Sequence, residues 1–412
     1  MQICIYTKMY ISLLPNTNKI IMETTKITIK TGPPVEGDDF YGREKELQYA
    51  WENLILKGIS ILLSAPRRVG KSSFSKKMLK LAEENEWNVL YLDLQGISTE
   101  DQFVGLFKDK LHSEKWWERT KSKIGETTLK LFDSIEDFEI AGNRISINSD
   151  AWRGNAYDKI QKVIEGADEI LIVMDELTIF LDNLLKQEDG KKRVEDFLEW
   201  LRKFRQISGT KVHWIFCSSV GITNFASMHQ LSKHLNDVHS FPISAYSEIE
   251  AKDFISRLDV SDKIKFDEEQ IQYILDKLKW YLPFFIQILV EKINSLVLIE
   301  GKQFSNDTID EAYNRLLTEE RFNTWDERLK EYHEYEDTAR RILKICTSPD
   351  GKSRGDLLVN LSAKKSNQEK IETDLARLLS MLQNDGYLME NDGKYVFRSP
   401  LLRDFWYKRF IL

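Results

Sequence analysis

Short apolar runs recur along the first 245 residues and are separated by helix-like patterns. The runs cover residues 59–63, 88–94, 169–174, 212–217 and 239–243. Such alternation is typical of a parallel α/β sheet, because each crossover between parallel strands needs a connecting helix. A strand buried on both faces reads as a continuous apolar run, and residues 170–174 form the most strongly apolar of them. We therefore expect this run at the centre of the sheet.

Beyond residue 246 the pattern changes. Apolar residues follow a helical period at 251–258, 268–279 and 284–299, which predicts a small helical domain after the sheet. The C-terminal segment, residues 336–412, has a pattern of its own. Its predicted elements are three amphipathic helices at 336–347, 354–361 and 367–384, and two strands at 387–390 and 394–397 around an Asn-Asp-Gly turn. Three helices followed by a hairpin predict a winged helix-turn-helix.

These patterns divide the chain into four parts, at 1–36, 37–245, 246–335 and 336–412. Within the α/β part, alternating apolar and polar residues predict a hairpin insertion near 138–147. The first 21 residues have a short apolar centre ended by Pro15, and they lack the length and cleavage site of a signal peptide. We expect the N-terminal extension to be disordered, or in part to precede a start at Met22. A weakly bound N-terminal strand is the alternative.

Composition limits the function classes. The 412 residues are 42% hydrophobic and 30% charged, as in soluble globular proteins. The net charge of −7 gives no overall reason to bind nucleic acid. Cys4, Cys217 and Cys346 form no metal pattern and are too few for a disulfide framework, which favours a cytoplasmic location. No run approaches the ~20 apolar residues of a membrane span, so we expect no membrane partner.

The chemistry is concentrated first in one loop, which lies between the predicted strand at 59–63 and a helical pattern from Lys71 to Glu84. A loop in this setting binds phosphate, because it turns backbone N–H groups and a helix N-terminus towards the anion. Lys71 adds charge and Ser72 a hydroxyl for Mg²⁺. Ala65 replaces the usual first glycine, which requires a negative φ there. The predicted phosphate-binding residues are Pro66, Arg67, Arg68, Val69, Gly70, Lys71, Ser72 and Ser73.

Hydrolysis needs carboxylates as well as a phosphate loop. Asp175 and Glu176 directly follow the most apolar strand. We expect Asp175 to hold Mg²⁺ and Glu176 to orient and deprotonate the attacking water.

Two further sets of residues are candidates. Ser218 and Ser219 end the next strand and would sense a γ-phosphate, if that strand lies beside the loop strand. A simple strand-end turn is the alternative. Arg202 and Arg205, on the preceding helix, are candidates for an arginine finger that acts on a neighbouring subunit of a homo-oligomer. Solvated surface arginines are the alternative there.

Together these motifs resemble the archaeal-type ATPase family, among the STAND/AAA+-related P-loop ATPases and near the origin-recognition initiators. The resemblance covers residue 37 to the C-terminus and rests on FYGREKEL at 40–47, the loop, Asp175-Glu176 and Ser218-Ser219. It implies an α/β P-loop domain, a helical lid over 246–335 and a C-terminal winged helix, with ATP and Mg²⁺ as ligands. It also implies adenine contacts by the backbone at Tyr41, Gly42 and Arg43, and a lid contact by Pro283. Tyr281 stands in the place of the lid's glycine, and no arginine stands beside Pro283.

We therefore expect an ATPase that uses ATP binding and slow hydrolysis as a conformational switch, with ADP as product. Two output classes stay open: a winged helix that holds duplex DNA, or one that binds a protein effector or packs on its own core. Residues 338–412 contain 14 Lys/Arg and 9 Asp/Glu, a net +5 that favours DNA. The third helix of the unit carries Glu369, Glu372 and Asp374 in its first half, which disfavours a DNA groove. On balance these charges slightly favour duplex DNA over a protein partner.

Overall fold

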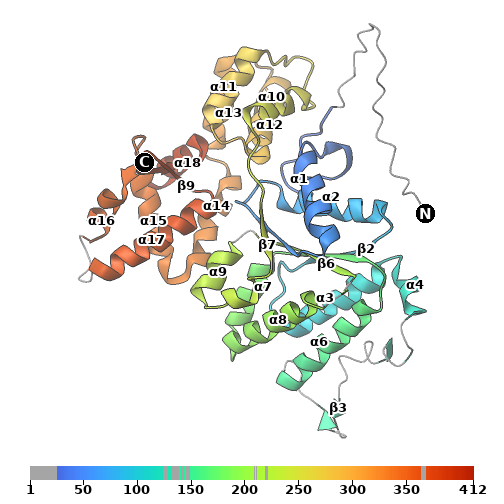
Figure 1. The fold of residues 1–412 in the computed structure, drawn as a ribbon. Coiled ribbons are helices and arrows are strands. Elements are labelled where there is room, and N and C mark those ends of the chain that lie inside the picture. Colours follow the sequence, from blue (N-terminus) through green and yellow to red (C-terminus); the bar gives the residue numbers. More distant parts are fainter. Residues whose placement is uncertain are drawn as a thin grey trace, which may run out of the picture.

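A five-stranded parallel sheet forms the core of the N-terminal part (Figure 1). The computed structural model describes residues 26–123, 126, 129–130, 139–140, 143–144, 149–207, 209, 211–218, 221–362 and 368–412. The strands are β1 (Ile61–Ser64), β2 (Asn88–Asp93), β5 (Ile170–Asp175), β6 (Val212–Cys217) and β7 (His239–Pro242). Their order is β2–β5–β6–β1–β7, and every pair is parallel. The predicted α/β P-loop fold class is confirmed.

The expectation for the central strand needs a correction. All residues of β5 and of β6 are buried, but β6 occupies the middle of the sheet and β5 lies one place from it. Any interior strand is covered on both faces, so an apolar run indicates an interior strand but does not show which interior strand lies at the centre of the sheet. The order also places β6 between β1, which leads into the phosphate loop, and β5, which ends in the two predicted carboxylates.

Helices cover both faces of the sheet (Figure 1). Alternate strand residues face two separate cores, because side chains along a strand point to opposite sides. One face packs against α1 (Glu44–Tyr49) and α2 (Lys71–Glu84). The other face is covered by α3 (Glu100–Ser113), α6 (Asp150–Glu165), α7 (Leu177–Leu185), α8 (Gly190–Arg205) and α9 (Ile222–Met228). Between α4 (Trp117–Lys121) and α6, β3 (Glu139–Ile140) pairs antiparallel with β4 (Asn143–Arg144), inside the segment where the hairpin was predicted.

A helical lid follows the sheet. It consists of α10 (Glu248–Arg257), α11 (Glu268–Leu278), α12 (Pro283–Leu298) and α13 (Asn306–Leu316). Ser247 and Asp267 begin α10 and α11 with reciprocal capping boxes, which fix where these helices start. Residues 320–335, here called the connector, contain α14 (Asn323–Glu327) and lead to the C-terminal unit.

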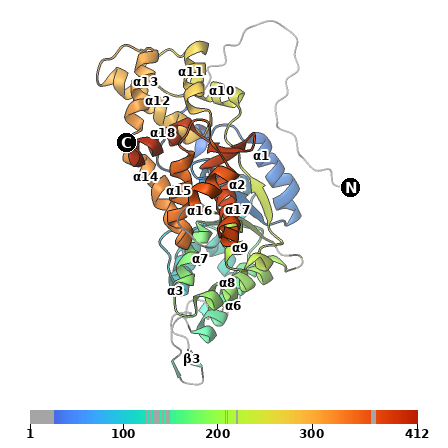
Figure 2. The same ribbon diagram turned by 90° about the vertical axis from the view of Figure 1, so that its left-hand side faces the viewer.

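The C-terminal unit has the element order of a winged helix. It contains α15 (Glu336–Cys346), β8 (Lys352–Ser353), α16 (Arg354–Ser362), α17 (Gln368–Asn384), β9 (Leu388–Asn391), β10 (Lys394–Phe397) and α18 (Pro400–Phe410). The strands form an antiparallel sheet in the order β8–β10–β9. Sequence patterns did not predict β8 or α18. The end of α17 lies beside α9, where Asn384 donates a hydrogen bond to Asn224 at 3.2 Å (Figure 2).

The N-terminal extension also needs a correction. Residues 26–36 are packed rather than disordered: Ile27 bridges to Leu258 at the end of α10, and its side chain is buried. The segment then crosses to α2, where the Val35 N–H donates to Ser73 Oγ at 2.9 Å. Residues 1–25 lie outside the described part of the chain. Over the described ranges, no helix is both long enough and apolar enough to cross a membrane.

Candidate nucleotide site

The loop between β1 and α2 has the geometry of an anion cradle. Its left-handed residues are Arg68, with φ +67°, and Gly70, with φ +102°. Ala65 is not among the residues with positive φ, which explains why alanine can replace the first glycine of the usual pattern. The loop leads directly into the N-terminus of α2, whose first N–H groups have no partner within the helix. Backbone donors and the helix dipole therefore favour an anion here.

Lys71 is a buried cation inside this loop. It is 7% exposed, and its Nζ donates to the carbonyl oxygens of Ala65 at 2.8 Å and Pro66 at 3.0 Å. Burial, and after it the positive charge of Arg328, lower the pKa of Lys71 to about 8, whereas the charges of Glu176 and Asp175 act in the opposite direction. A buried cation beside a second cation is stabilised by a bound anion.

Three carboxylates face the loop from the strand ends. Asp175, 5% exposed, accepts hydrogen bonds from the Tyr91 hydroxyl at 2.6 Å and from the Glu176 N–H at 3.0 Å. Burial and the charge of Asp175 raise the pKa of Tyr91, so the tyrosine remains a donor. Glu176 begins α7 with φ +57°, a left-handed conformation that is uncommon outside glycine. Asp93, which sequence reasoning missed, pairs in register with Asp175 across β2 and β5.

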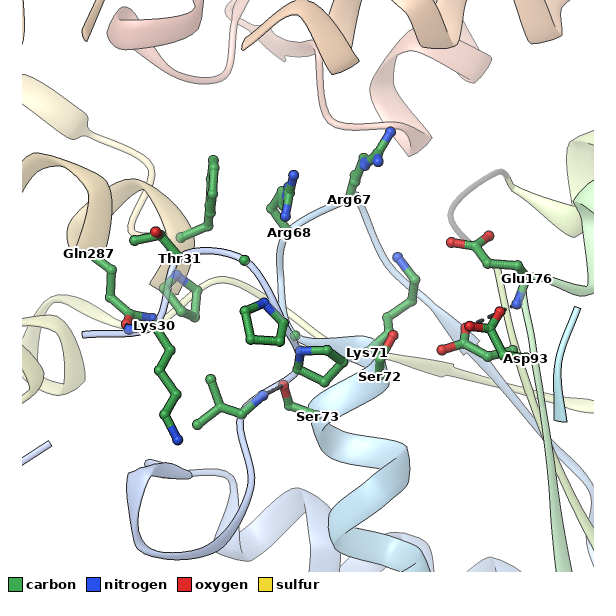
Figure 3. Close-up of a pocket in the computed structure, with 18 of the residues that line it drawn as sticks. Lys30, Thr31, Arg67, Arg68, Lys71, Ser72, Ser73, Asp93, Glu176 and Gln287 are labelled. Atoms are coloured by element: carbon green, nitrogen blue, oxygen red, sulfur yellow. Dashed lines mark hydrogen bonds between the residues drawn. The ribbon is translucent and has the colours of Figure 1, made fainter. Parts of the chain in front are cut away.

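These groups surround one cavity of about 320 Å³, a size typical of small-ligand sites. Figure 3 shows Lys71 and Ser72 between the carboxylates Asp93 and Glu176 on one side and the segment that carries Lys30 and Thr31 on the other. The predicted loop residues Arg67, Arg68, Gly70, Lys71, Ser72 and Ser73 all line the cavity, together with Asp175, Glu176 and Pro283. Residues 30–35 line it too, and no sequence signal had placed them there.

The predicted adenine contacts lie at a smaller adjoining cavity of about 50 Å³. Tyr41 and Arg43 line it with Val69, Pro283 and Gln287. Pro66, one of the predicted phosphate-binding residues, lies next to Gly386 in the turn after α17, so close that a Cβ on Gly386 would contact it.

Hydrogen bonds fix the ends of the Tyr41–Arg43 segment. Tyr41 donates to Asp253 of α10 at 2.6 Å. Arg43 is buried and donates to the Ser244 carbonyl at 2.5 Å and to Glu46 at 3.1 Å, so its guanidinium braces the fold. Gly42, with φ +67°, is the turn residue between them. The segment therefore offers backbone groups rather than the arginine charge to a ligand.

The remaining predicted residues are not brought into this cavity. Ser218 is buried and lines a separate cavity of about 80 Å³ with Ser64, Ala65 and Asp385. Ser219 lies outside the described residues. Arg205 is turned inward: its side chain is 1% exposed and donates to Asp237 at 2.9 Å and to the His234 carbonyl at 2.8 Å. An arginine finger has to project from the surface, so the expectation for Arg205 does not hold in this conformation.

The residues present fit a magnesium nucleotide. The loop supplies N–H donors and a buried lysine for phosphate, while Ser72 and Asp175 supply the oxygen ligands that Mg²⁺ prefers. Within the described ranges no cluster of three or more His, Cys, Asp or Glu residues is arranged to hold a metal by itself. A cation at this place would share its ligands between protein oxygens and phosphate oxygens, which is the usual arrangement for Mg²⁺.

Comparison with solved structures identifies the fold. The Walker-type ATPase paby2304 of Pyrococcus abyssi superposes with a TM-score of 0.62 at 15% identity, over 92% of this chain and 99% of that chain. The ORC2 protein of Aeropyrum pernix, in its ADPNP–ADP complexes, gives 0.51 at 10% identity, over 90% and 96%. The sequence matches no family model and no curated protein. The predicted resemblance to archaeal-type P-loop ATPases is thus confirmed at the level of the fold.

Proposed function

We propose that this chain is a Mg²⁺-dependent ATPase in which bound nucleotide switches the conformation of the C-terminal unit. The observation that carries the proposal is the buried Lys71, which faces Asp175 and Glu176 across a cavity of suitable size. Lys71 and the N–H groups of the loop bind the phosphates, and Tyr41, Gly42 and Pro283 contact the base. Glu176 orients the attacking water and accepts its proton. Ser72 and Asp175 would hold Mg²⁺, which when bound neutralises charge on the phosphate oxygens.

Calorimetric titration with ATP and Mg²⁺ tests the binding step. The wild-type chain is expected to bind, and Lys71→Ala to lose binding while its far-UV circular dichroism stays unchanged. Lys80, an exposed lysine of the same helix, provides the matched control as Lys80→Ala. Equal affinity in the Lys71→Ala and Lys80→Ala proteins would refute the phosphate-loop assignment.

For the output, we propose that the winged helix packs on its own ATPase domain or binds a protein effector, in preference to DNA. Over residues 371–384 of α17, one exposed residue is basic, so the described part of this helix presents no basic cluster to DNA. The exposed residues of this range are Glu372, Thr373, Ala376, Arg377, Ser380 and Asn384. Arg398 of the wing is a basic residue that could contact DNA phosphates, but its guanidinium lies over the Trp280 ring at 5.4 Å and is partly buried. The C-terminal end of α17 is already bound to α9.

Titration of the full chain with duplex DNA separates the two outputs. A DNA-binding winged helix would bind at low salt and lose affinity with a log–log slope of roughly −0.9 per phosphate contacted. It would also respond to Lys394→Ala, since Lys394 is an exposed wing residue. We expect no such binding. Salt-steep binding that Lys394→Ala weakens would instead establish the DNA reading.

A further inference from the structure

The connector and the turn after α17 reach the phosphate loop from the C-terminal side. Gly386 has φ +85°, and a Cβ there would lie 2.8 Å from Pro66 Cβ. Its neighbour Asp385 is buried and lines the cavity that Ser64 and Ala65 also line. His333 of the connector pairs with Asp182 of α7 at 3.0 Å. The C-terminal unit is therefore packed directly on the nucleotide-binding layer.

Arg328 of the connector lies at the centre of this contact. It is 3% exposed, and its Nη2 lies 3.5 Å from Asp385 Oδ1. The Tyr332 hydroxyl donates to the other oxygen of Asp385 at 2.7 Å, and the Nε of Arg328 lies 3.7 Å from Glu331. Both Nε and Nη1 lack a hydrogen-bond partner among the described residues. Arg328 thus forms long ion pairs and keeps unused donors, although burial normally demands that such donors be satisfied.

The charged side chains of Arg328 and Glu331 in the connector interact electrostatically with Lys71 and Glu176 of the cavity. Arg328 is the group that, after burial, contributes most to lowering the pKa of Lys71. Burial raises the pKa of Glu331 to about 7; Arg328 opposes this shift, and the charges of Asp385 and Glu176 add to it. Contacts place these groups together: Asp385, the ion-pair partner of Arg328, lines a cavity with Ala65, whose carbonyl oxygen accepts a hydrogen bond from Lys71. Arg328, Asp385 and Lys71 are all buried, so they share one weakly screened environment. A polyphosphate held by Lys71 would introduce several negative charges into it.

We propose that Arg328 senses the phosphates of the bound nucleotide, and that its ion pair with Asp385 couples their charge to the position of the winged helix. The proposal rests on the proposed function, because it needs ATP at Lys71. A triphosphate competes with the single carboxylate of Asp385 for Arg328, and a diphosphate competes less. When Arg328 leaves Asp385, the buried carboxylate loses its cation, so the contact between Gly386 and Pro66 weakens.

The test compares ATP with ADP in two measurements: affinity by calorimetry, and amide hydrogen exchange over the turn that contains Asp385 and Gly386. In the wild-type chain, a non-hydrolysable ATP analogue is expected to speed exchange at this turn about tenfold relative to ADP. Arg328→Gln should weaken ATP binding about tenfold, as expected for one charge-assisted hydrogen bond, and leave ADP binding within about twofold. Arg328→Lys should retain part of the preference.

Removing only one partner of a buried pair can destabilise the fold, so a second variant is needed. Arg328→Met combined with Asp385→Leu removes both charges and is expected to fold, bind ADP and show equal exchange with either nucleotide. Arg340→Gln is the matched control, because Arg340 pairs with Glu336 at 2.9 Å and its variant should keep the wild-type response.

The outcomes separate the two proposals. A nucleotide-dependent difference in exchange that survives in the double variant would overturn the role of Arg328, and so would equal losses of ATP and ADP affinity in Arg328→Gln. Either result leaves ATP binding at Lys71 intact. A wild-type chain that binds neither nucleotide would remove the proposed function itself, and the role of Arg328 with it.

Discussion

Gly386 of the C-terminal unit lies directly over Pro66 of the phosphate loop. A Cβ at residue 386 would approach Pro66 Cβ to 2.8 Å and Trp280 Cη2 to 2.6 Å, and the φ of +85° suits only glycine. Both obstacles are rigid rings. The position therefore requires glycine for two reasons, its backbone conformation and the close approach of its neighbours. At this point the C-terminal unit contacts both the phosphate loop, through Pro66, and the lid, through Trp280.

We predict that Gly386→Ala separates the winged helix from the loop. Gly393→Ala in the turn between β9 and β10 is the matched control, because its φ is +73° but a Cβ there meets nothing within 4 Å. Both variants should lose unfolding free energy because alanine is strained in a left-handed conformation, and only Gly386→Ala should lose a further ~1–3 kcal/mol through the steric clash. Urea unfolding measures the difference. Equal losses of stability in the two variants would contradict the close contact.

The affinity for ATP should fall as the pH rises above about 8. The free protein loses the Lys71 proton with a pKa of about 8, because burial disfavours the charged form. Bound phosphate favours that charge, so the complex holds the proton to higher pH and binding takes up a proton. The dissociation constant should then increase up to about tenfold per pH unit above 8. Lys71→Arg, whose guanidinium stays charged, should give a flat profile between pH 7 and 9. A flat profile in the wild-type chain would contradict the buried-cation assignment.

Glu176 and Asp175 should fail in different ways. Glu176→Gln removes the group that accepts the proton of water, so turnover should fall roughly 10²–10⁴-fold while ATP stays bound. Asp175→Asn should weaken Mg²⁺-dependent binding as well. Glu84→Gln, at an exposed position of α2, is the control for loss of a carboxylate. Steady-state hydrolysis and calorimetry distinguish these outcomes, and wild-type turnover in Glu176→Gln would exclude its role as base.

Arg205 should matter for stability rather than for catalysis between subunits. Arg205→Ala leaves Asp237 without its cation and is expected to cost about 3 kcal/mol of unfolding free energy. Arg202, on the same helix and less buried, serves as the comparison through Arg202→Ala. ATP hydrolysis per molecule should be the same in Arg205→Ala as in the wild type over a dilution series. A rate that depends on concentration and is lost in this variant would restore the arginine-finger assignment.

The carboxylates of the site show which residues can be predicted from their position at the end of an apolar strand and which cannot. Asp175 and Glu176 were predicted because they follow the most apolar run, and the structure places them at the cavity. Asp93 also ends a strand, yet it was missed, since the pattern does not say which strands are neighbours. Its place beside Asp175 follows from the pairing of β2 with β5. The same uncertainty explains why β5 was expected in the middle of the sheet.

The sequence by itself determined the local features of this protein. A strand, a loop with Gly70-Lys71-Ser72 and a helix suffice to predict an anion cradle, because backbone geometry and a helix N-terminus act over a few residues. Apolar periodicity likewise predicted the sheet, the lid and the main winged-helix elements. Tertiary structure alone decided that residues 30–35 line the cavity, that Arg205 turns inward to Asp237, and that Arg328 and Gly386 reach the phosphate loop. These features depend on packing between segments that lie from tens to hundreds of residues apart, and no local period encodes which distant surfaces will meet.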